Sequence, residues 1–454
     1  MERMSTLDAG FYLVDHRNVP MHLGSVAVFD GPALRRAEIA ELYADRLAPM
    51  PRYRQVVRTA PLQLLRPAWA DDPDFDVDDH VRHLRVPRPG GEEQLRELAA
   101  RIFAEPLDPC RPLWEAWLLD GLEGGRWAVL SKVHHCMVDG VGGSDLMSAL
   151  FGPQPAQERP SRPADGVAEA IARPVRDLAR AATCVLTQLP GMPEVAAYSQ
   201  GLARGARRLA APSVSSLNGP AGRRRLWAWA SVSLDDLRQI RGVLGGTVND
   251  VLLAAVAGSL RAVIPERELA GDPVVRSLVP VSIRTAAESG AVANRLSAVL
   301  VNLPVAEPEP ARRLALIRAQ TEDLKRTHQA AGPALISGLL STVAPPLLAL
   351  GLRAAFRLPQ PLVQTVTTNV AGPQVRLSAL GRPVVAIYPY APIGGNVRIS
   401  MAMYSYADTI YFGVTAGDAA VAEPQELIKG LDHEIAILSG LAGPHQETVT
   451  SVAG

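Results

Sequence analysis

The chain has very little lysine and no excess of charge of either sign. Of its 454 residues, 46 are Lys or Arg and 46 are Asp or Glu, so the formal net charge at pH 7 is zero. Only Lys132, Lys325 and Lys429 are lysines. Nucleic-acid-binding domains usually present a broad positive surface, so this balance argues against a nucleic-acid partner. It leaves a lipid partner open, because apolar surface alone can attract lipid.

Cysteine is also scarce. Cys110, Cys136 and Cys184 cannot form a disulfide framework in a chain of this length, and no CxxC spacing occurs. The first residues lack the apolar stretch of a secretory signal. We therefore expect a cytoplasmic protein, with peripheral association to a membrane or lipid droplet left open.

Several common catalytic motifs are missing from the chain. It contains no GxSxG elbow, no Walker A loop and no HExxH pair. A glycine-rich run at 140–145 stops short of a dinucleotide fingerprint, since Asp145 stands at the third glycine position. His80 and His83 share one predicted surface without further ligands at metal spacing. We therefore expect neither a cofactor nor a metal.

One long run carries no charge. Residues 329–352 read QAAGPALISGLLSTVAPPLLALGL, and about 20 apolar residues suffice for a transmembrane helix. Pro345 and Pro346 interrupt the run, and a proline inside a helix removes a hydrogen bond and clashes with the preceding turn. The run therefore predicts two short apolar helices and not a membrane span. Packing inside the protein and contact with a lipid surface remain equally open.

The length and the 48% hydrophobic content predict two domains with large cores. We place an N-terminal domain at 1–155, a crossover linker rich in Arg, Ala and Pro at 156–224, and a C-terminal domain at 225–454. Strand-like runs are 24–29, 127–133, 225–232, 274–281, 295–303, 362–370, 384–388, 397–404 and 410–414. Helix-like runs are 33–47, 92–103, 143–150, 167–189, 233–243, 248–263 and 424–441. This alternation predicts an α/β fold in both domains.

A histidine-rich turn follows the strand-like run 127–133. It reads HHCMVDG over residues 134–140, so two of the nine histidines are adjacent and an aspartate and a glycine follow. A histidine at the end of a strand can project into a cleft with a pKa close to working pH. The glycine allows the backbone to turn tightly. We call this segment the HHCMVDG turn.

The HHCMVDG turn matches the HHxxxDG motif of the CoA-dependent acyltransferase superfamily. The rest of the chain resembles, from end to end, the bacterial wax ester synthase/diacylglycerol acyltransferase family of that superfamily. The resembling segments are 5–11, 74–83, Pro112-Leu113-Trp114, 217–220 (LNGP), 247–250, 279–284, 294–297 and 369–373. The resemblance implies two similar chloramphenicol-acetyltransferase-like domains with the active-site tunnel between them.

The resemblance also assigns roles to residues of the turn. His135 is then the general base, which takes the proton of the acceptor hydroxyl as that oxygen attacks the acyl-CoA thioester, without a covalent enzyme intermediate. His134 supports it, and Asp139 and Gly140 order the loop. Arg284 is the expected ion-pair partner of Asp139.

Other motif residues have more than one interpretation. Asn249, Asp250 and Arg284 are candidates for contacts with the substrate or the oxyanion, although Asn249 and Asp250 at the head of an apolar helix also fit a helix cap. We interpret Pro112-Leu113-Trp114 as a packing element. Cys136 is expected to be a small buried apolar residue and not a nucleophile.

The resemblance implies an O-acyltransferase that uses acyl-CoA and a lipid alcohol, either diacylglycerol or a long-chain fatty alcohol. The first alternative is a condensation-type acyltransferase that acts on a carrier-bound, peptide or polyketide acceptor. The second is a non-catalytic homologue that binds lipid droplets.

Overall fold

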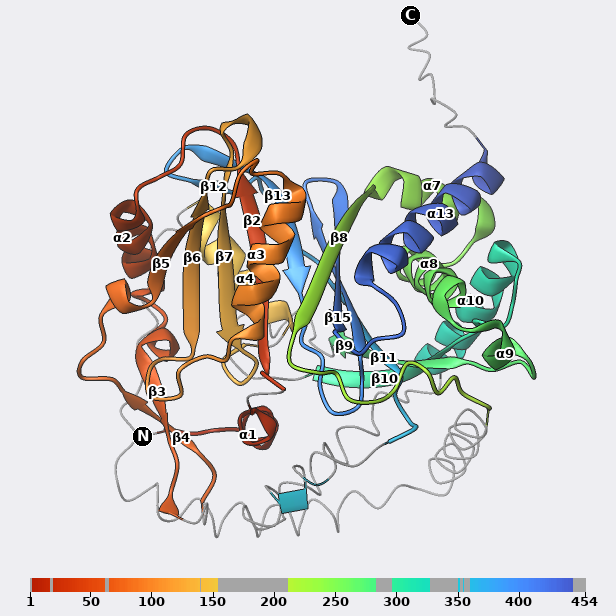
Figure 1. Ribbon diagram of the computed structural model, residues 1–454, viewed down its shortest axis with the longest axis horizontal. Coiled ribbons are helices and arrows are strands. Elements are labelled where there is room, and N and C mark those ends of the chain that lie inside the picture. Colours follow the sequence, from red (N-terminus) through yellow and green to blue (C-terminus); the bar gives the residue numbers. More distant parts are fainter. Residues whose placement is uncertain are drawn as a thin grey trace, which may run out of the picture.

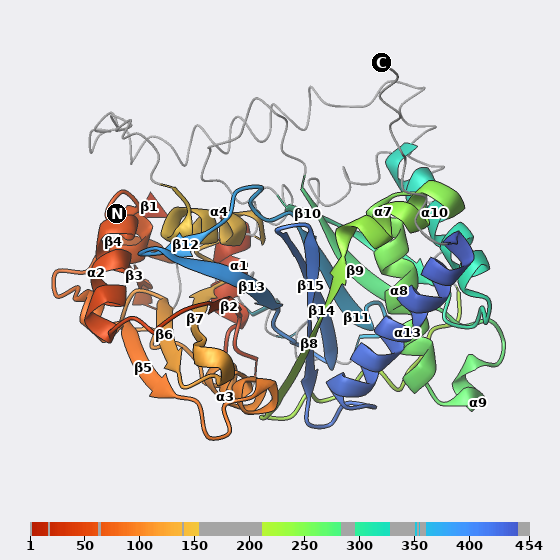
Figure 2. The same ribbon diagram turned by 90° about the horizontal axis from the view of Figure 1, so that it is seen from above.

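Two six-stranded sheets and one three-stranded sheet organise the part of the chain that the structure describes (Figure 1). The structure is a computed structural model, and it describes residues 2–16, 19–61, 65–138, 140–153, 211–282, 296–326, 350–351, 354 and 360–443. Each large sheet belongs to one half of the molecule, and the two halves lie side by side in both views (Figures 1 and 2).

The first sheet has the strand order β12-β13-β2-β7-β6-β5. Its strands are β12 (Ser378–Ala379), β13 (Arg382–Tyr390), β2 (His22–Phe29), β7 (Trp127–His134), β6 (Trp114–Asp120) and β5 (Val81–Arg85). Neighbours are antiparallel, except that β5 runs parallel to β6. All eight residues of the central strand β7 are buried, as expected of a strand covered on both faces.

Helices cover both faces of this sheet. They are α2 (Arg36–Leu47), α3 (Glu92–Ala104) and α4 (Gly140–Phe151). The hydroxyl of Tyr43 in α2 lies 3.0 Å from Ser131 Oγ, whereas the next residue of β7, Lys132, donates from Nζ to the carbonyl of Ile102 in α3 at 3.1 Å. Successive side chains of a strand point to opposite faces, so α2 and α3 lie on opposite sides.

The second sheet has the order β10-β9-β11-β14-β15-β8. Its strands are β10 (Leu296–Leu303), β9 (Val275–Ser282), β11 (Thr365–Val370), β14 (Ile399–Tyr406), β15 (Thr409–Gly417) and β8 (Arg225–Ser233). The helices of this half are α7 (Leu234–Leu244), α8 (Val248–Val263), α9 (Glu266–Leu269), α10 (Pro310–Arg326) and α13 (Pro424–Ala442), on the side away from the first sheet (Figures 1 and 2). The predicted helix 248–263 is confirmed, and Ser233 caps α7 by accepting the amides of Asp235 and Asp236.

Alternate residues along a strand of the second sheet face two different hydrophobic cores. On β8, Ala228 packs in the helix-covered core of the second half, whereas Trp227 and Trp229 pack with the core of the first half. Trp229 stacks on Tyr388 of β13 with ring centroids 4.5 Å apart, and Tyr390 stacks on Phe103 at 3.9 Å. An aromatic seam therefore joins the halves.

One hairpin crosses from the second half into the first sheet. Strands β12 and β13 lie within the predicted C-terminal domain 225–454, yet β13 pairs with β2 of the N-terminal half, for example Ile387 with Ala27. The predicted domain boundaries assign this hairpin to the C-terminal domain and do not anticipate that β13 joins the first sheet. Residues 156–210 of the predicted linker lie outside the described residues, and from 211 onward Val214 and Leu217 are buried in the core of the second half.

A small third sheet and a short helix adjoin the first sheet. The strands are β1 (Glu2–Arg3), β4 (Ala68–Asp71) and β3 (Gln55–Arg58), and the helix is α1 (Thr6–Val14). Short 3-10 turns occupy Pro51–Arg54, Val77–Asp79 and Glu123–Gly125.

No single helix among the described residues has the length and hydropathy that a membrane span requires. Within the described part of the chain, only α7 and α8 taken together reach this length and hydropathy, and these two helices are bent by 96° to each other. Of the predicted apolar run 329–352, only residues 350–351 belong to the described part of the chain, so the two predicted helices lie outside it.

Candidate active site

The HHCMVDG turn begins at the end of the buried strand β7. His134 is the last residue of β7 and pairs with His22 of β2. The His134 amide donates to the Leu113 carbonyl at 2.9 Å, and the His135 amide donates to the Met21 carbonyl at 2.8 Å. Neighbouring strands and loops on both sides therefore fix the backbone of the two histidines.

His134 is enclosed and holds the turn. Its side chain is 2% exposed, its Nδ1 accepts the Cys136 amide at 3.0 Å, and its Nε2 lies 3.5 Å from Asp15 Oδ2. Because Nδ1 accepts a hydrogen bond, the proton of the neutral ring is on Nε2, where it faces the carboxylate. These contacts suit the supporting role that the sequence predicts for His134.

His135 is only partly buried and has an aromatic neighbour. Its ring stacks on Phe11 of α1, with centroids 3.9 Å apart and planes inclined by 14°. A half-buried imidazole on a backbone held from two sides is a suitable arrangement for a general base.

Cys136 is unsuited to act as a nucleophile. It is 4% exposed, and burial raises the pKa of its thiol well above the ordinary range, with the nearby carboxylates Asp8 and Asp15 adding to the effect. The reactive form of cysteine is the thiolate, which such a site disfavours. The expected buried, apolar role of Cys136 is confirmed.

Asp139 and Arg284 lie outside the described residues, so their predicted ion pair stays a prediction. Gly140 is the first residue of α4, and α4 contacts β11 of the second half. The turn is thus followed by a helix that reaches across to the other half of the molecule.

Pro112, Leu113 and Trp114 form a scaffold beside the turn. The indole of Trp114 donates to the Tyr53 carbonyl at 2.8 Å and stacks on His80 at 4.5 Å, and the Leu113 carbonyl accepts the His134 amide. This element therefore sets the register of the turn through its backbone and packing.

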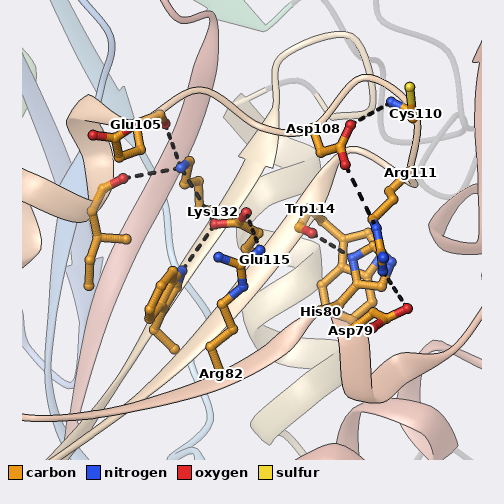
Figure 3. A network of polar contacts seen from close by, with 12 residues as sticks. Asp79, His80, Arg82, Glu105, Asp108, Cys110, Arg111, Trp114, Glu115 and Lys132 are labelled. Carbon is orange, nitrogen blue, oxygen red and sulfur yellow. Dashed lines mark hydrogen bonds and ion pairs between the residues drawn. The ribbon is translucent and has the colours of Figure 1, made fainter.

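The prediction that His80 and His83 share one surface is wrong. His80 is 3% exposed, and its Nδ1 donates to the Trp114 carbonyl at 2.8 Å (Figure 3). The His83 side chain is 43% exposed and lies 3.2 Å from Asp120 Oδ2. His80 is buried at the end of the 3-10 turn Val77–Asp79, whereas His83 lies among the exposed residues of β5.

Asn249 connects motifs from two elements of the second half. The amide of Asn369, near the end of β11, donates to Asn249 Oδ1 at 3.3 Å. Since β11 contacts α4, which continues from the HHCMVDG turn, Asn249 is linked to the turn through Asn369 of β11 and then through α4. The Oδ1 of Asn249 is an acceptor here, so Nδ2 is the group that it can offer as a donor.

Asp250 serves as a helix cap. Its Oδ2 accepts the amide and the hydroxyl of Thr247, each at 2.8 Å, and its Oδ1 accepts the Thr321 hydroxyl at 2.7 Å. It is 2% exposed. A carboxylate that accepts at both oxygens has no proton to donate to an oxyanion, so the capping interpretation describes this residue.

The LNGP segment (residues 217–220) is structural. Asn218 Nδ2 donates to the Val363 carbonyl at 2.9 Å, and the Gly219 amide donates to the Asn396 carbonyl at 2.8 Å. Gly219 has φ +140°, and a Cβ there would lie 2.2 Å from the Arg398 guanidinium. The segment thus anchors the chain, as it leaves the crossover, to the loop before β14.

Sequence reasoning missed Phe11 and Asp15 as neighbours of the histidines. Phe11 lies in segment 5–11, which resembles the family, but the resemblance assigns it no role. No motif or spacing in the sequence points to Asp15. The predicted tunnel stays a prediction. A small pocket of about 30 Å³ lies between the start of α3 and the aromatic seam, and no residue of the turn lines it.

Comparison with known proteins finds the same family in both halves. Residues 4–252 match the wax ester synthase/diacylglycerol acyltransferase catalytic domain, and residues 292–439 match the C-terminal domain of that family. The probable diacylglycerol O-acyltransferase tgs1 of Mycobacterium tuberculosis is 36% identical over 450 residues, which cover 97% of this chain and 96% of that protein.

Solved structures show the same fold. The wax ester synthase/diacylglycerol acyltransferase from Marinobacter aquaeolei aligns with a TM-score of 0.69 at 23% identity, over 97% of this chain and all of that one. The first condensation domain of the calcium-dependent antibiotic synthetase aligns with a TM-score of 0.60 at 17% identity, over the whole of this chain and 98% of that one. These likenesses confirm the predicted fold class. The two family matches, which together span most of the sequence, establish that the chain belongs to the wax ester synthase/diacylglycerol acyltransferase family of O-acyltransferases.

Proposed function

We propose that this protein transfers an acyl group from acyl-CoA to the hydroxyl of a lipid alcohol. The acceptor is diacylglycerol or a long-chain fatty alcohol, and the product is triacylglycerol or wax ester. The observation that carries the proposal is an intact HHCMVDG turn at the end of β7 in a chain that matches the family in both halves. The name of the mycobacterial relative supports diacylglycerol, and the name of the Marinobacter protein supports both acceptors.

His135 acts as the general base in this proposal. It takes the hydroxyl proton while the acceptor oxygen attacks the thioester carbonyl, and it returns the proton to the CoA sulfur as the C–S bond breaks. The backbone hydrogen bond to Met21 and the stacking on Phe11 support this role, because together they fix the position of the imidazole. His134 stabilises the turn through its contacts with the Cys136 amide and the Asp15 carboxylate.

The developing oxyanion requires a hydrogen-bond donor. Asn249 is our candidate, because its Oδ1 already accepts from Asn369 and its Nδ2 is the group that it presents as a donor. The imidazolium of His135 is the second candidate. We place Asp250 behind both as an oxyanion donor, since both of its oxygens accept hydrogen bonds.

The transfer needs no covalent enzyme intermediate. A thioester is already activated, so orientation and removal of a proton account for most of the barrier that the enzyme must lower. The burial of Cys136, the only thiol in the turn, supports direct transfer. The proposed reaction also uses no cofactor, since acyl-CoA enters as a substrate.

The test offers palmitoyl-CoA to the purified protein with dioleoylglycerol, hexadecanol and short alcohols in parallel. The lipid acceptors are supplied in phospholipid vesicles, and free CoA and the ester product are measured. We expect ester formation with at least one lipid acceptor, and a rate about 10²–10⁴-fold lower with the His135→Ala variant. Turnover only with an acyl group or acceptor tethered to a carrier protein would favour the condensation-type alternative. Vesicle binding without any turnover would favour the non-catalytic, lipid-binding one.

A further inference from the structure

Helix α1 contacts the HHCMVDG turn although it lies more than a hundred residues earlier in the chain. Its N-terminus is capped by Ser5, whose Oγ accepts the Asp8 amide at 3.1 Å. One side of the helix is anchored by buried Ala9 and Leu13 in the core of the first half. Figure 1 shows α1 beyond the lower ends of the central strands of the first sheet. A helix held in this way can present its other side chains to the turn as a fixed surface.

Phe11 is the side chain that α1 presents to His135. The two rings are nearly parallel, at 14°, with centroids 3.9 Å apart. Rotation of an imidazole about χ2 is otherwise soft, because terminal sp³–sp² torsions have broad minima. A stacked neighbour limits this rotation and so fixes the direction of the ring nitrogens. The face of the Phe11 ring also attracts the positive charge that the imidazole gains when it takes a proton.

Asp15 connects the end of the same helix to the backbone of the turn. Its Oδ1 accepts the Met21 amide at 2.9 Å, and its Oδ2 lies 3.5 Å from His134 Nε2. The Met21 carbonyl in turn accepts the His135 amide at 2.8 Å. The same carboxylate thus steadies the residue that holds His135 and the ring that holds Cys136.

We propose that α1 is a positioning element of the acyltransferase site, with Phe11 fixing the plane of the His135 ring and Asp15 fixing the turn that carries it. This inference rests on the proposed role of His135 as the general base. Phe11 and Asp15 act through the two histidines, so they are positioning residues and not catalytic ones. A base whose nitrogen is misaligned by a fraction of an ångström loses rate while substrate binding is largely kept.

The test compares Phe11→Leu, Phe11→Tyr and the wild type, with Leu7→Ala as the matched control. Leu7 is an apolar residue one turn earlier in α1 and is 36% exposed. We expect Phe11→Leu to lower kcat about tenfold, and more if the ring turns away, with KM for palmitoyl-CoA changed by less than about twofold. Phe11→Tyr restores a stacking ring and is expected to keep most of kcat. Asp15→Ala is expected to lower kcat in the same way, with Asp15→Asn less affected because its Oδ1 still accepts.

A second readout does not depend on turnover. In protein labelled with ¹³C at histidine Cε1, the ring current of Phe11 displaces the His135 signal, which is identified by its loss in His135→Ala. We expect this signal to move in Phe11→Leu and to keep its position in Leu7→Ala. An unmoved signal in a folded Phe11→Leu variant would refute the stacking.

The two proposals fail in different ways. Full kcat in Phe11→Leu, with His135→Ala inactive, would overturn the positioning role of Phe11 alone. An active His135→Ala variant would overturn the general-base role itself. A large rise in KM with unchanged kcat in Phe11→Leu would show that Phe11 binds substrate and would also overturn the positioning role.

Discussion

His134 and His135 are adjacent in the chain but have different surroundings. The HHxxxDG resemblance singles out the pair and assigns the base to the second histidine, yet the physical reason for the difference comes from the fold. His134 is enclosed, with one nitrogen on the Cys136 amide and the other facing Asp15, whereas His135 is half-buried against Phe11. Neither Asp15 nor Phe11 could be identified as a partner from residue spacing, because both contacts depend on how α1 packs against the end of β7.

At this scale we predict that Cys136→Ala retains acyl transfer. The thiol is buried and its raised pKa disfavours the thiolate, so its removal takes away packing and no chemistry. We expect kcat to stay within about twofold of the wild type, at a cost of up to about 1 kcal/mol in the free energy of unfolding. The measurement pairs turnover with incubation in radiolabelled palmitoyl-CoA without acceptor. An inactive variant, or label bound to wild-type Cys136, would contradict direct transfer.

At the scale of elements, the sequence predicts the helices and strands that their own hydrophobic pattern identifies. The bounds of helix α8 were predicted correctly, because its apolar run is long and begins at a capping residue. Strand β6 was missed, because its charged Glu115 is paired by Lys132 and Arg82 from neighbouring strands (Figure 3). The exchange of β13 into the first sheet could not be predicted either. The alternation of apolar and polar residues identifies the two faces of a strand, but it does not identify the strand that pairs with it.

The cap of α8 yields a prediction of stability. Asp250 accepts from Thr247 and Thr321 while it is almost fully buried, so Asp250→Ala leaves the partly buried amide and hydroxyl of Thr247 without their acceptor. We expect a loss of about 2–3 kcal/mol in the free energy of unfolding, measured by urea denaturation. Asp235→Ala, in the first turn of α7 with an exposed ion pair to Arg238, is the matched control and should lose less than about 1 kcal/mol. Equal losses in the two variants would show that the capping contacts of Asp250 contribute little.

At the scale of the whole molecule, an aromatic seam and an exchanged hairpin join the two halves. Neither was visible in the predicted division at 155 and 224, because both depend on contacts between residues more than a hundred positions apart. His22 lies at this seam, with its Nε2 2.7 Å from the Phe103 carbonyl and its ring 5.8 Å from that of Tyr390. A carbonyl can only accept, so His22 is held with its proton on Nε2.

The seam should make the fold sensitive to acid. Burial, and secondly the charge of Lys132, lower the pKa of His22 well below its ordinary value of 6.5. The unfolded chain therefore binds a proton below about pH 6.5 that the folded chain does not, and stability falls as the pH drops from there toward the folded-state value. We expect His22 to contribute a slope of up to about 1.4 kcal/mol per pH unit in urea unfolding between pH 7 and 5.

The comparison that checks this slope is His22→Gln against His83→Gln, a change at an exposed histidine. The first variant should be less stable at pH 7 but lose stability more slowly toward pH 5 than the wild type. The second is expected to keep the wild-type slope. A His22→Gln variant with the full wild-type slope would assign the acid sensitivity to other groups.

The central claim is that His135 is the general base of a direct transfer from acyl-CoA to a lipid hydroxyl. The most direct measurement is the rate of CoA release from palmitoyl-CoA in the presence of dioleoylglycerol or hexadecanol, for the wild type and for His135→Ala, with thermal unfolding of both proteins recorded alongside. We predict a loss of about 10²–10⁴-fold in kcat with an unchanged unfolding temperature. A folded His135→Ala variant that releases CoA and forms ester at the wild-type rate would contradict the account.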